Sequence, residues 1–567
     1  MKAWCAFFGL AAAALLCAGL FDVPAVRGAD QPSWKAPNVE WINRLIRQKW
    51  QEDPENPIRP SEPATDAEFV RRLYLDVLGR IPSADEARRY ILSKDSDKKA
   101  RLIRRLLYEE PYAGEYASYW ATVWSDLLVG RNPESRDVNK AALTKWLRDA
   151  FAANKPWNEL VYELLTATGA NNPESLKDEV PYNGAVNFLL AHRGDRATRN
   201  VPATSFTTRL FLGVQVQCTQ CHDHPFNDRT QADFWGINAF FQQVEAERVT
   251  ELTDTGRRVI RYVVLRDRPV SSGDPLFVLY ERRNGLVIAA VPRLLNGREI
   301  REGTEGLNLR EELAKWITSE ENPYFAAAIV NRMWGHFLGR GIVHPVDDLG
   351  KHNPPSNPEL LYRLAANFKE AGYDLKQLVQ WIVLSEPYGL SSRTNRTNEK
   401  DDTYFSHYLM KQMTPDQFFE SLMIATGAYK SGAVRPEDAY RMKQELKRQF
   451  TAVFGNDENR EADTFAGTIP QALLMMNGRL IQQAVSLKKG SYLRQLIDRT
   501  RRKHRRGAAA RIVDELYLSA LSRFPTRSER SMALRMVAQY AARGKEDQAY
   551  QDIFWALLNS AEFALVH

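Results

Sequence analysis

Apolar residues recur at helical spacing along most of the chain. Phe69, Leu73 and Val77 follow one another at intervals of four, which places them on one face of a helix. Several such stretches begin after a Ser or Thr that stands three positions before Glu or Gln, the signature of a capping box. We therefore predict a mainly α fold. The predicted boxes are Thr65 with Glu68, Ser83 with Glu86, Ser356 with Glu359, Thr414 with Gln417, and Thr526 with Glu529.

Residues 245–300 have a different pattern. The segments 257–265, 276–280 and 286–290 are short and rich in β-branched or other apolar residues. Asn284-Gly285 lies between the last two segments and is a strong hairpin signal. We expect one small antiparallel sheet here, inserted between an N-terminal helical domain (29–244) and a C-terminal helical domain (301–567).

One stretch near the start of the chain is echoed near its end. LYLDVLGRIPSADE (73–86) resembles LYLSALSRFPTRSE (516–529). Each predicts a helix, a break that contains proline, and a newly capped helix. The period is far too long for a solenoid, so we expect one helix-turn-helix unit used twice.

The first residues have the pattern of a secretory signal. Lys2 precedes an apolar stretch at 3–20, and the small residues Val26 and Gly28 suit cleavage before Ala29. An uncleaved anchor is the alternative, because the stretch is at the short limit for spanning a membrane. We expect a signal peptide at 1–28 and an exported protein, periplasmic or extracellular, with no membrane span after cleavage.

Composition excludes several classes of protein. The 567 residues are 44% hydrophobic and include 13 Trp, 22 Tyr and 25 Phe, too many apolar groups for a disordered chain. A mean hydropathy of −0.44 excludes a polytopic membrane protein. The net charge is only +7, and the basic run at 500–506 has no accompanying nucleic-acid motif, so we expect no nucleic-acid partner.

Cysteine usage points to one short segment. The chain has 4 cysteines, and the first two, Cys5 and Cys17, leave with the signal peptide. Cys218 and Cys221 remain and form C-x-x-C-H with His222, the attachment motif of c-type haem. Two thiols at this spacing reach the two vinyl groups of the porphyrin, and His222 then presents a nitrogen to the iron as proximal ligand. Such attachment takes place outside the cytoplasm, in agreement with export.

Two other interpretations of this segment stay open. Cys218 and Cys221 could close a short disulfide. Alternatively, His222 and His224 could join the thiolates around a divalent metal, although four ligands within seven residues would strain a tetrahedral site. The polar residues Asp223 and His224 are unusual beside a haem.

A haem iron also needs a sixth ligand or an open face. His336 and Met333 are candidates because they stand three residues apart in 331–341 and can share a helix face. His344 and His352 lie nearby, with Asp347-Asp348 between them. The signatures of serine hydrolases, P-loop enzymes, zinc peptidases and dinucleotide-binding enzymes are absent from the sequence, so no enzyme class follows from it.

Residues 211–241, FLGVQVQCTQCHDHPFNDRTQADFWGINAFF, resemble the signature of the secreted planctomycete cytochrome-like family, which consists of two paired domains of unknown function. The resemblance continues at 68–91, which is similar to the start of the first domain, and at 313–361, which is similar to the start of the second. Segments 414–418 and 470–481 also fit.

The resemblance implies that Cys218, Cys221, His222 and His224 match the family's C-x-x-C-H-x-H-P-F core. Members are often fused to c-type cytochrome or carbohydrate-binding modules, so a redox partner or polysaccharide-associated envelope proteins are the expected partners. This chain departs from the family at two positions of the second domain. Asn357 stands where many relatives carry His, and His344 stands where many carry another residue.

Two functions follow as expectations. The first is an exported protein with a single covalent haem c that transfers electrons at the cell envelope. The second is a haem-free binding or scaffold protein of the envelope, in which C-x-x-C-H-x-H is a disulfide clip or a metal knuckle.

Overall fold

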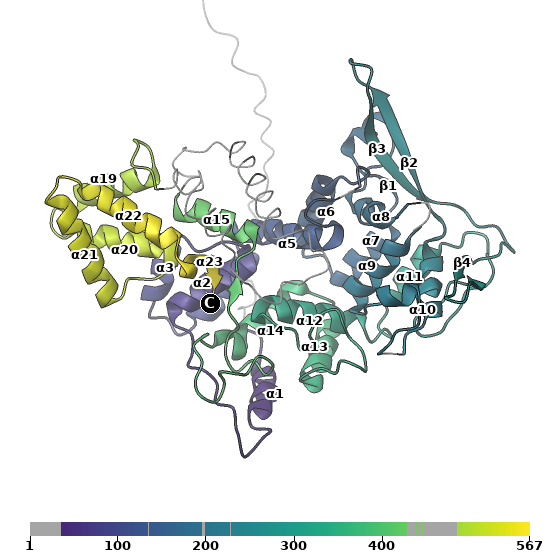
Figure 1. Ribbon diagram of the computed structural model, residues 1–567, viewed down its shortest axis with the longest axis horizontal. Coiled ribbons are helices and arrows are strands. Elements are labelled where there is room, and N and C mark those ends of the chain that lie inside the picture. The colour runs from purple at the N-terminus through teal and green to yellow at the C-terminus, as the bar shows by residue number, and fades with distance from the viewer. Residues whose placement is uncertain are drawn as a thin grey trace, which may run out of the picture. The chain divides into compact units, whose positions relative to one another are not determined.

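The computed structural model describes residues 36–133, 135–195, 199–226, 228–427, 438, 441, 445 and 485–567 (Figure 1). Residues 38–567 form one compact unit. The predicted signal peptide lies outside the described residues, so export stays a prediction. Within the described residues, no helix is long and apolar enough to cross a membrane.

The N-terminal half is helical, as predicted. Its helices bury apolar stripes and expose charged faces; α4, for example, buries Leu102, Ile103, Leu106 and Leu107 while Arg101 and Arg105 are exposed. The α-helices are α1 (Glu40–Trp50), α2 (Asp66–Leu78), α3 (Ala84–Leu92), α4 (Lys98–Tyr108), α5 (Tyr112–Val129), α6 (Lys140–Ala152), α7 (Trp157–Thr166), α8 (Asn187–His192), α9 (Val201–Leu212) and α10 (Gln231–Asn238), and the 3-10 helices are η1 (Pro173–Asp178), η2 (Gly184–Val186), η3 (Gln217–Gln220) and η4 (Ala239–Phe241).

The C-terminal half is also built from helices. They are α11 (Leu309–Ile317), α12 (Phe325–Leu338), α13 (Pro358–Glu370), α14 (Leu375–Leu384), η5 (Pro387–Gly389), α15 (Pro415–Ala425), α19 (Tyr492–Lys503), α20 (Ala508–Leu521), α21 (Arg527–Ala541), α22 (Glu546–Leu558) and α23 (Ala561–Ala564). The mainly α prediction is confirmed.

The predicted β insert forms two sheets rather than one. The hairpin of β4 (Val278–Glu281) and β5 (Val287–Ala290) turns at Gly285, whose φ of 80° suits glycine. β3 (Arg258–Asp267) belongs to a separate three-stranded sheet of order β1-β3-β2. Its neighbours, β1 (Gly169–Ala170) and β2 (Val244–Leu252), were not expected. The sequence of β2, VEAERVTEL, is charged and mostly exposed, so a search for alternating apolar residues does not detect this strand.

Four of the five predicted capping boxes are confirmed, and in each both reciprocal hydrogen bonds are present. They start α2, α3, α15 and α21 at Thr65, Ser83, Thr414 and Thr526. A further box, Thr230 with Asp233, starts α10.

The box predicted at Ser356 is wrong. Helix α13 begins at Pro358, which suits the first helical position and makes Asn357 the N-cap. The Asn357 side chain accepts from Leu360 N at 3.1 Å and donates to Leu45 O at 3.1 Å, which ties α13 to α1. Ser356 instead donates to Ile342 O at 3.0 Å. Asn357, the position that departs from the resembled family, is therefore a buried structural residue here.

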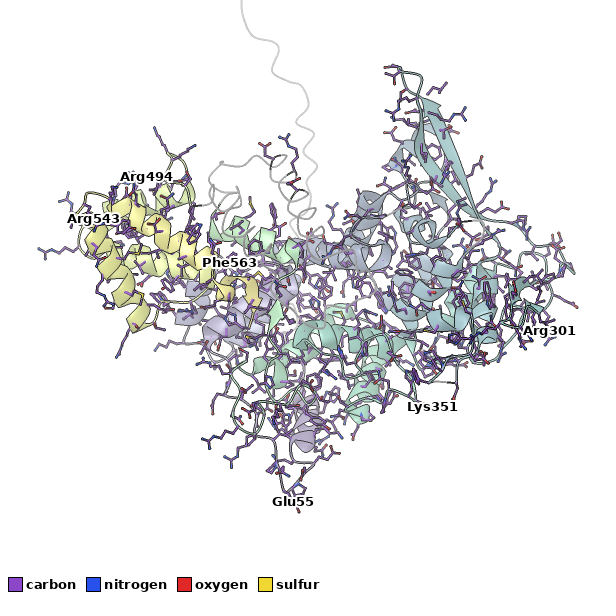
Figure 2. The ribbon with its side chains drawn as sticks, in the orientation of Figure 1. Glu55, Arg301, Lys351, Arg494, Arg543 and Phe563 are labelled. Atoms are coloured by element: carbon purple, nitrogen blue, oxygen red, sulfur yellow. The ribbon has the colours of Figure 1, made fainter. Side chains whose placement is uncertain are left out.

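The two ends of the described chain are joined through α2. Arg71 is fully buried and donates to Ala520 O at 3.0 Å and to Phe563 O at 2.7 Å. Arg72 is fully buried as well and donates to Leu390 O at 2.9 Å, with its guanidinium 3.6 Å from the centroid of the Tyr408 ring. The strand pair β6 (Lys411–Gln412) and β7 (Leu565–Val566) closes the same region. Phe563 is labelled in Figure 2.

Candidate functional site

The segment that carries the cysteine pair leaves α9 through a tight turn. Gly213 ends the helix with a φ of 64°, and a Cβ at this position would lie 2.7 Å from Leu349 Cδ1. The next turn, η3, is held by Thr219, which is buried and donates through its hydroxyl to Val216 O at 2.7 Å. On this fixed turn Cys218 and Cys221 are both free and exposed. The fold thus presents the two thiols to solvent.

Helix α10 clamps the turn from the other side. Gln231 Nε2 donates to Gln220 O at 3.1 Å and to Glu281 O of β4 at 3.0 Å. Trp235 Nε1 also donates to Gln220 O, at 3.1 Å, and its ring stacks on Tyr280 at 5.6 Å. The turn is therefore tied to the β4–β5 hairpin, although its thiols stay open.

His222 is oriented by its own backbone. Its Nδ1 lies 2.7 Å from Asp223 O, so Nδ1 carries the proton and donates to this carbonyl. That tautomer leaves the lone pair on Nε2, the arrangement found in histidines that bind iron or zinc. Among the described residues, Nε2 has no hydrogen-bond partner.

His224 faces the C-terminal half. Its Nδ1 accepts from Phe226 N at 3.2 Å, and its ring centroid lies 5.9 Å from that of His352. His352 Nε2 in turn lies 3.0 Å from Asp348 Oδ1. Burial lowers the pKa of His224, the neighbouring His352 lowers it further, and Asp348 acts in the opposite direction. The structure therefore brings His224 together with His352 and Asp348, which sequence reasoning had left separate.

A charged layer lies beneath this contact. Asp347 is nearly buried and accepts from Gln215 Nε2 at 2.9 Å, and the guanidinium groups of Arg209 and Arg332 lie 3.8 Å and 4.0 Å away. Leu349 N also donates to Gly213 O at 2.7 Å. The loop at 342–353 is thus fastened to the turn. The contacts of Asp347 with Gln215 and Arg209, like the bond between Leu349 and Gly213, join residues more than a hundred positions apart, so no local pattern could have indicated them.

The rim of the site is exposed and polar. Lys351, labelled in Figure 2, is 92% exposed, and its Nζ lies 3.2 Å from Asp228 Oδ2. Phe226 is 78% exposed and offers the site an apolar ring. Two shallow pockets lie elsewhere, on α19 and α21.

His336 and Met333, the candidate sixth ligands, lie in a different part of the protein. Met333 is buried at 2% exposure. His336 Nε2 lies 3.2 Å from Asp76 O, and its ring lies 4.8 Å from that of Trp120. Burial and the nearby Lys411 lower the pKa of His336 to about 4. Neither side chain contacts residues 218–224 in the part of the chain that the structure describes.

The surroundings of His336 form a closed polar cluster around Asp76. Asp76 is 1% exposed; its carboxylate accepts from Lys411 Nζ at 2.7 Å and from the Tyr388 hydroxyl at 2.9 Å. Tyr408 adds a third hydrogen bond at 3.3 Å, and Lys411 also donates to His336 O at 2.5 Å. Removing one partner from such a bonded, buried group would leave a charge uncompensated, so the role of this cluster is structural.

The residues of the exposed segment fit haem attachment better than a preformed metal site. Haem c needs two free thiols and an imidazole with an available nitrogen, and Cys218, Cys221 and His222 supply them. No three His, Cys, Asp or Glu side chains are grouped closely enough to hold a metal ion within the described ranges. A metal held by His222 and His224 would therefore require the segment to rearrange.

Comparisons with known families agree with the paired organisation. Residues 41–246 match the model PSCyt2, described as a protein of unknown function (DUF1549). Residues 309–537 match PSD1, described as a protein of unknown function (DUF1553). No curated protein and no solved structure matches the chain. The first match contains the cysteine pair and the second contains the 342–353 loop, so the site draws on both. The chain thus carries two successive domains of unknown function, the pairing that the sequence resemblance predicted.

Proposed function

We propose that the protein is an exported, cytochrome-like redox protein that carries one covalent haem on Cys218 and Cys221, with His222 as the axial ligand. The observation that carries this proposal is the pair of free, exposed thiols on one short turn, followed directly by an imidazole with an available Nε2. The predicted signal peptide and the resemblance to the planctomycete cytochrome-like family support the same function.

When bound, haem would supply reversible one-electron transfer. The chain's own residues position it. Gln231 and Trp235 hold the turn through Gln220 O, so the thiols keep their direction. The carbonyl of Asp223 fixes the His222 ring in the tautomer that can bind iron. Because the segment is exposed, an exported redox partner could approach the haem edge directly.

The absorption spectrum tests this function. Protein exported from cells that contain the c-type cytochrome maturation machinery should show a Soret band that persists after denaturation, because the link is covalent. Cys218→Ser/Cys221→Ser should abolish the band. His222→Ala should retain covalent haem but shift the band, whereas the matched control His352→Gln should change it little. Absence of the band from the wild-type protein would contradict the proposal.

A second candidate is a haem-free binding or scaffold protein, in which the segment holds a divalent metal or closes a disulfide. The approach of His224 to His352, with Asp348 bonded to His352, supports the metal version. Titration of the exported protein with Zn²⁺ tests it. Binding that is lost in both His224→Ala and His352→Ala, in protein without a Soret band, would favour the second candidate over the first.

A further inference from the structure

The helix pair α20–α21 repeats the contacts that one arginine makes in the pair α2–α3. In both, an arginine after the first helix binds two glutamates and the next backbone carbonyl, and it lies over a tyrosine of the first helix. The first copy uses Arg80 with Glu86 (3.1 Å), Glu115 (2.5 Å), Ile81 O (3.1 Å) and Tyr74. The second uses Arg523 with Glu529 (2.8 Å), Glu562 (2.6 Å), Phe524 O (3.3 Å) and Tyr517.

In the first copy, one face of α3 is covered by α20. Ala84 and Ala87 pack against Leu518 in a small separate core. Beside it, Arg88 of α3 binds the carboxylate of Glu515. A helix therefore occupies this face through a leucine and a glutamate three residues apart, which share one helix face.

In the second copy, the equivalent face of α21 has no such cover among the described residues. It is hollowed into a shallow groove of about 500 Å³ lined by Arg527, Arg530, Ser531, Leu534, Arg535 and Ala538. Arg527, Arg530, Ser531 and Leu534 correspond in the repeat to Ala84, Ala87, Arg88 and Ile91. The side that is filled by α20 in one copy is thus open in the other.

The residues that line the groove determine which chemical groups a bound partner must carry. None of the six lining residues is acidic, and three are arginines. Arg530 is engaged by Asp514 of α20 at 2.5 Å, whereas Arg527 and Arg535 are exposed. Leu534 lies between them and is partly buried. An occupant must therefore bring carboxylates for the arginines and an apolar side chain for Leu534.

We infer that this α21 face is a docking site for an acidic amphipathic helix of a partner protein, which would lie across α21 where α20 lies across α3. Its carboxylates would bind the arginines that stand in place of Ala84 and Ala87. A flexible polyanion would satisfy the arginines but leave Leu534 uncovered. A second copy of this chain cannot offer its own α2 in the same way, because Arg72 and Leu75, the counterparts of Glu515 and Leu518, are buried. Helix-in-groove recognition of this kind uses anchors at spacings of three and four.

Fluorescence anisotropy with the full-length protein tests the inference. The probe is a labelled, stapled helical peptide with the sequence of residues 508–521, AAARIVDELYLSAL. Arg527→Glu/Arg535→Glu should weaken its binding at least tenfold, whereas Arg502→Glu/Arg505→Glu, on exposed arginines outside the groove, should leave it within twofold. A peptide with lysine at positions 514 and 515 should bind the Arg527→Glu/Arg535→Glu protein better than the wild type, which also shows that the variant is folded.

Several outcomes would overturn the inference. They are failure of the peptide to bind the wild-type protein, equal binding to wild type and Arg527→Glu/Arg535→Glu, or self-association that is lost in that variant. Binding of dextran sulfate through the same arginines without binding of the peptide would likewise contradict it, because the site would then recognise charge alone.

Discussion

Two regions of the protein place a histidine among other polar groups, and they differ in whether those groups are all bonded to one another. Around Asp76, a buried carboxylate, two tyrosines, Lys411 and His336 bond to one another. Around the cysteine pair, the thiols are exposed and His222 keeps Nε2 available. In the first region the polar groups bond to one another and hold α2 against the C-terminal half. The second leaves them open for a ligand, which is why we place the function there.

The largest expected effect is on the closed cluster. Asp76→Asn should lower the free energy of unfolding by about 3–5 kcal/mol, because the partly buried Lys411 would lose the carboxylate that balances its charge. Urea denaturation measures this. Asp149→Asn, which removes an exposed partner of Lys145, is the matched control and should change the stability by under about 0.5 kcal/mol. Equal effects of the two substitutions would remove the distinction between the regions.

Acid should next weaken the protein at two buried histidines, His336 of the closed cluster and His192, which lies 2.6 Å from Leu128 O at the end of α8. Burial lowers the pKa of both to about 4, against an ordinary value of 6.5. Between these pH values the unfolded chain binds protons that the folded protein does not, so stability is full above pH 6.5 and falls as the pH drops toward 4. Each histidine should contribute a loss of up to about 3 kcal/mol over this window.

Urea denaturation at several pH values between 7.5 and 4.5 measures this loss. His336→Gln should flatten the profile, because one of the titrating groups is gone. A profile of unchanged slope in His336→Gln would show that the buried imidazole is not held neutral.

A smaller loss of stability is expected from substituting Gly213, which begins the turn that carries the cysteine pair. Gly213→Ala and Gly256→Ala both place a side chain at a positive φ, of 64° and 73°, which costs roughly 1–2 kcal/mol. Only the Cβ at position 213 also meets a neighbour, Leu349. Gly213→Ala should therefore destabilise by about 1 kcal/mol more than Gly256→Ala in thermal or urea unfolding. Identical losses would mean that the 342–353 loop does not rest on the turn.

The open region itself should tolerate change best. Cys218→Ser/Cys221→Ser in protein without haem should alter the free energy of unfolding by under about 0.5 kcal/mol, because both side chains are exposed. Urea denaturation in reductant checks this against the Asp76→Asn result. A loss of several kcal/mol would assign the thiols a structural role and favour the clip.

Local features of the fold were predictable from sequence, and long-range ones were not. The caps at Thr65 and Thr526 depend on a glutamate three positions later, so the local sequence was enough to predict them. The cap predicted at Ser356 is wrong because Pro358 takes the first helical position and makes Asn357 the N-cap. The strand at 244–252 was missed because its charged residues give no strand pattern, and its conformation depends on pairing with β3.

The candidate site divides in the same way. Spacing alone made Cys218, Cys221 and His222 the candidates, and their role stays a prediction. The approach of His352 to His224 required the fold, since 128 residues separate them in the sequence. The sixth-ligand candidates His336 and Met333 share a helix, as expected, but burial places them in the core and away from the motif.

The intact mass of the mature, exported wild-type protein tests the central claim most directly. The account predicts the mass of the cleaved chain plus one covalently bound haem, and the bare chain mass for Cys218→Ser/Cys221→Ser prepared in parallel. A wild-type mass equal to that of the bare chain, or lower by two hydrogens as for a disulfide, would contradict it.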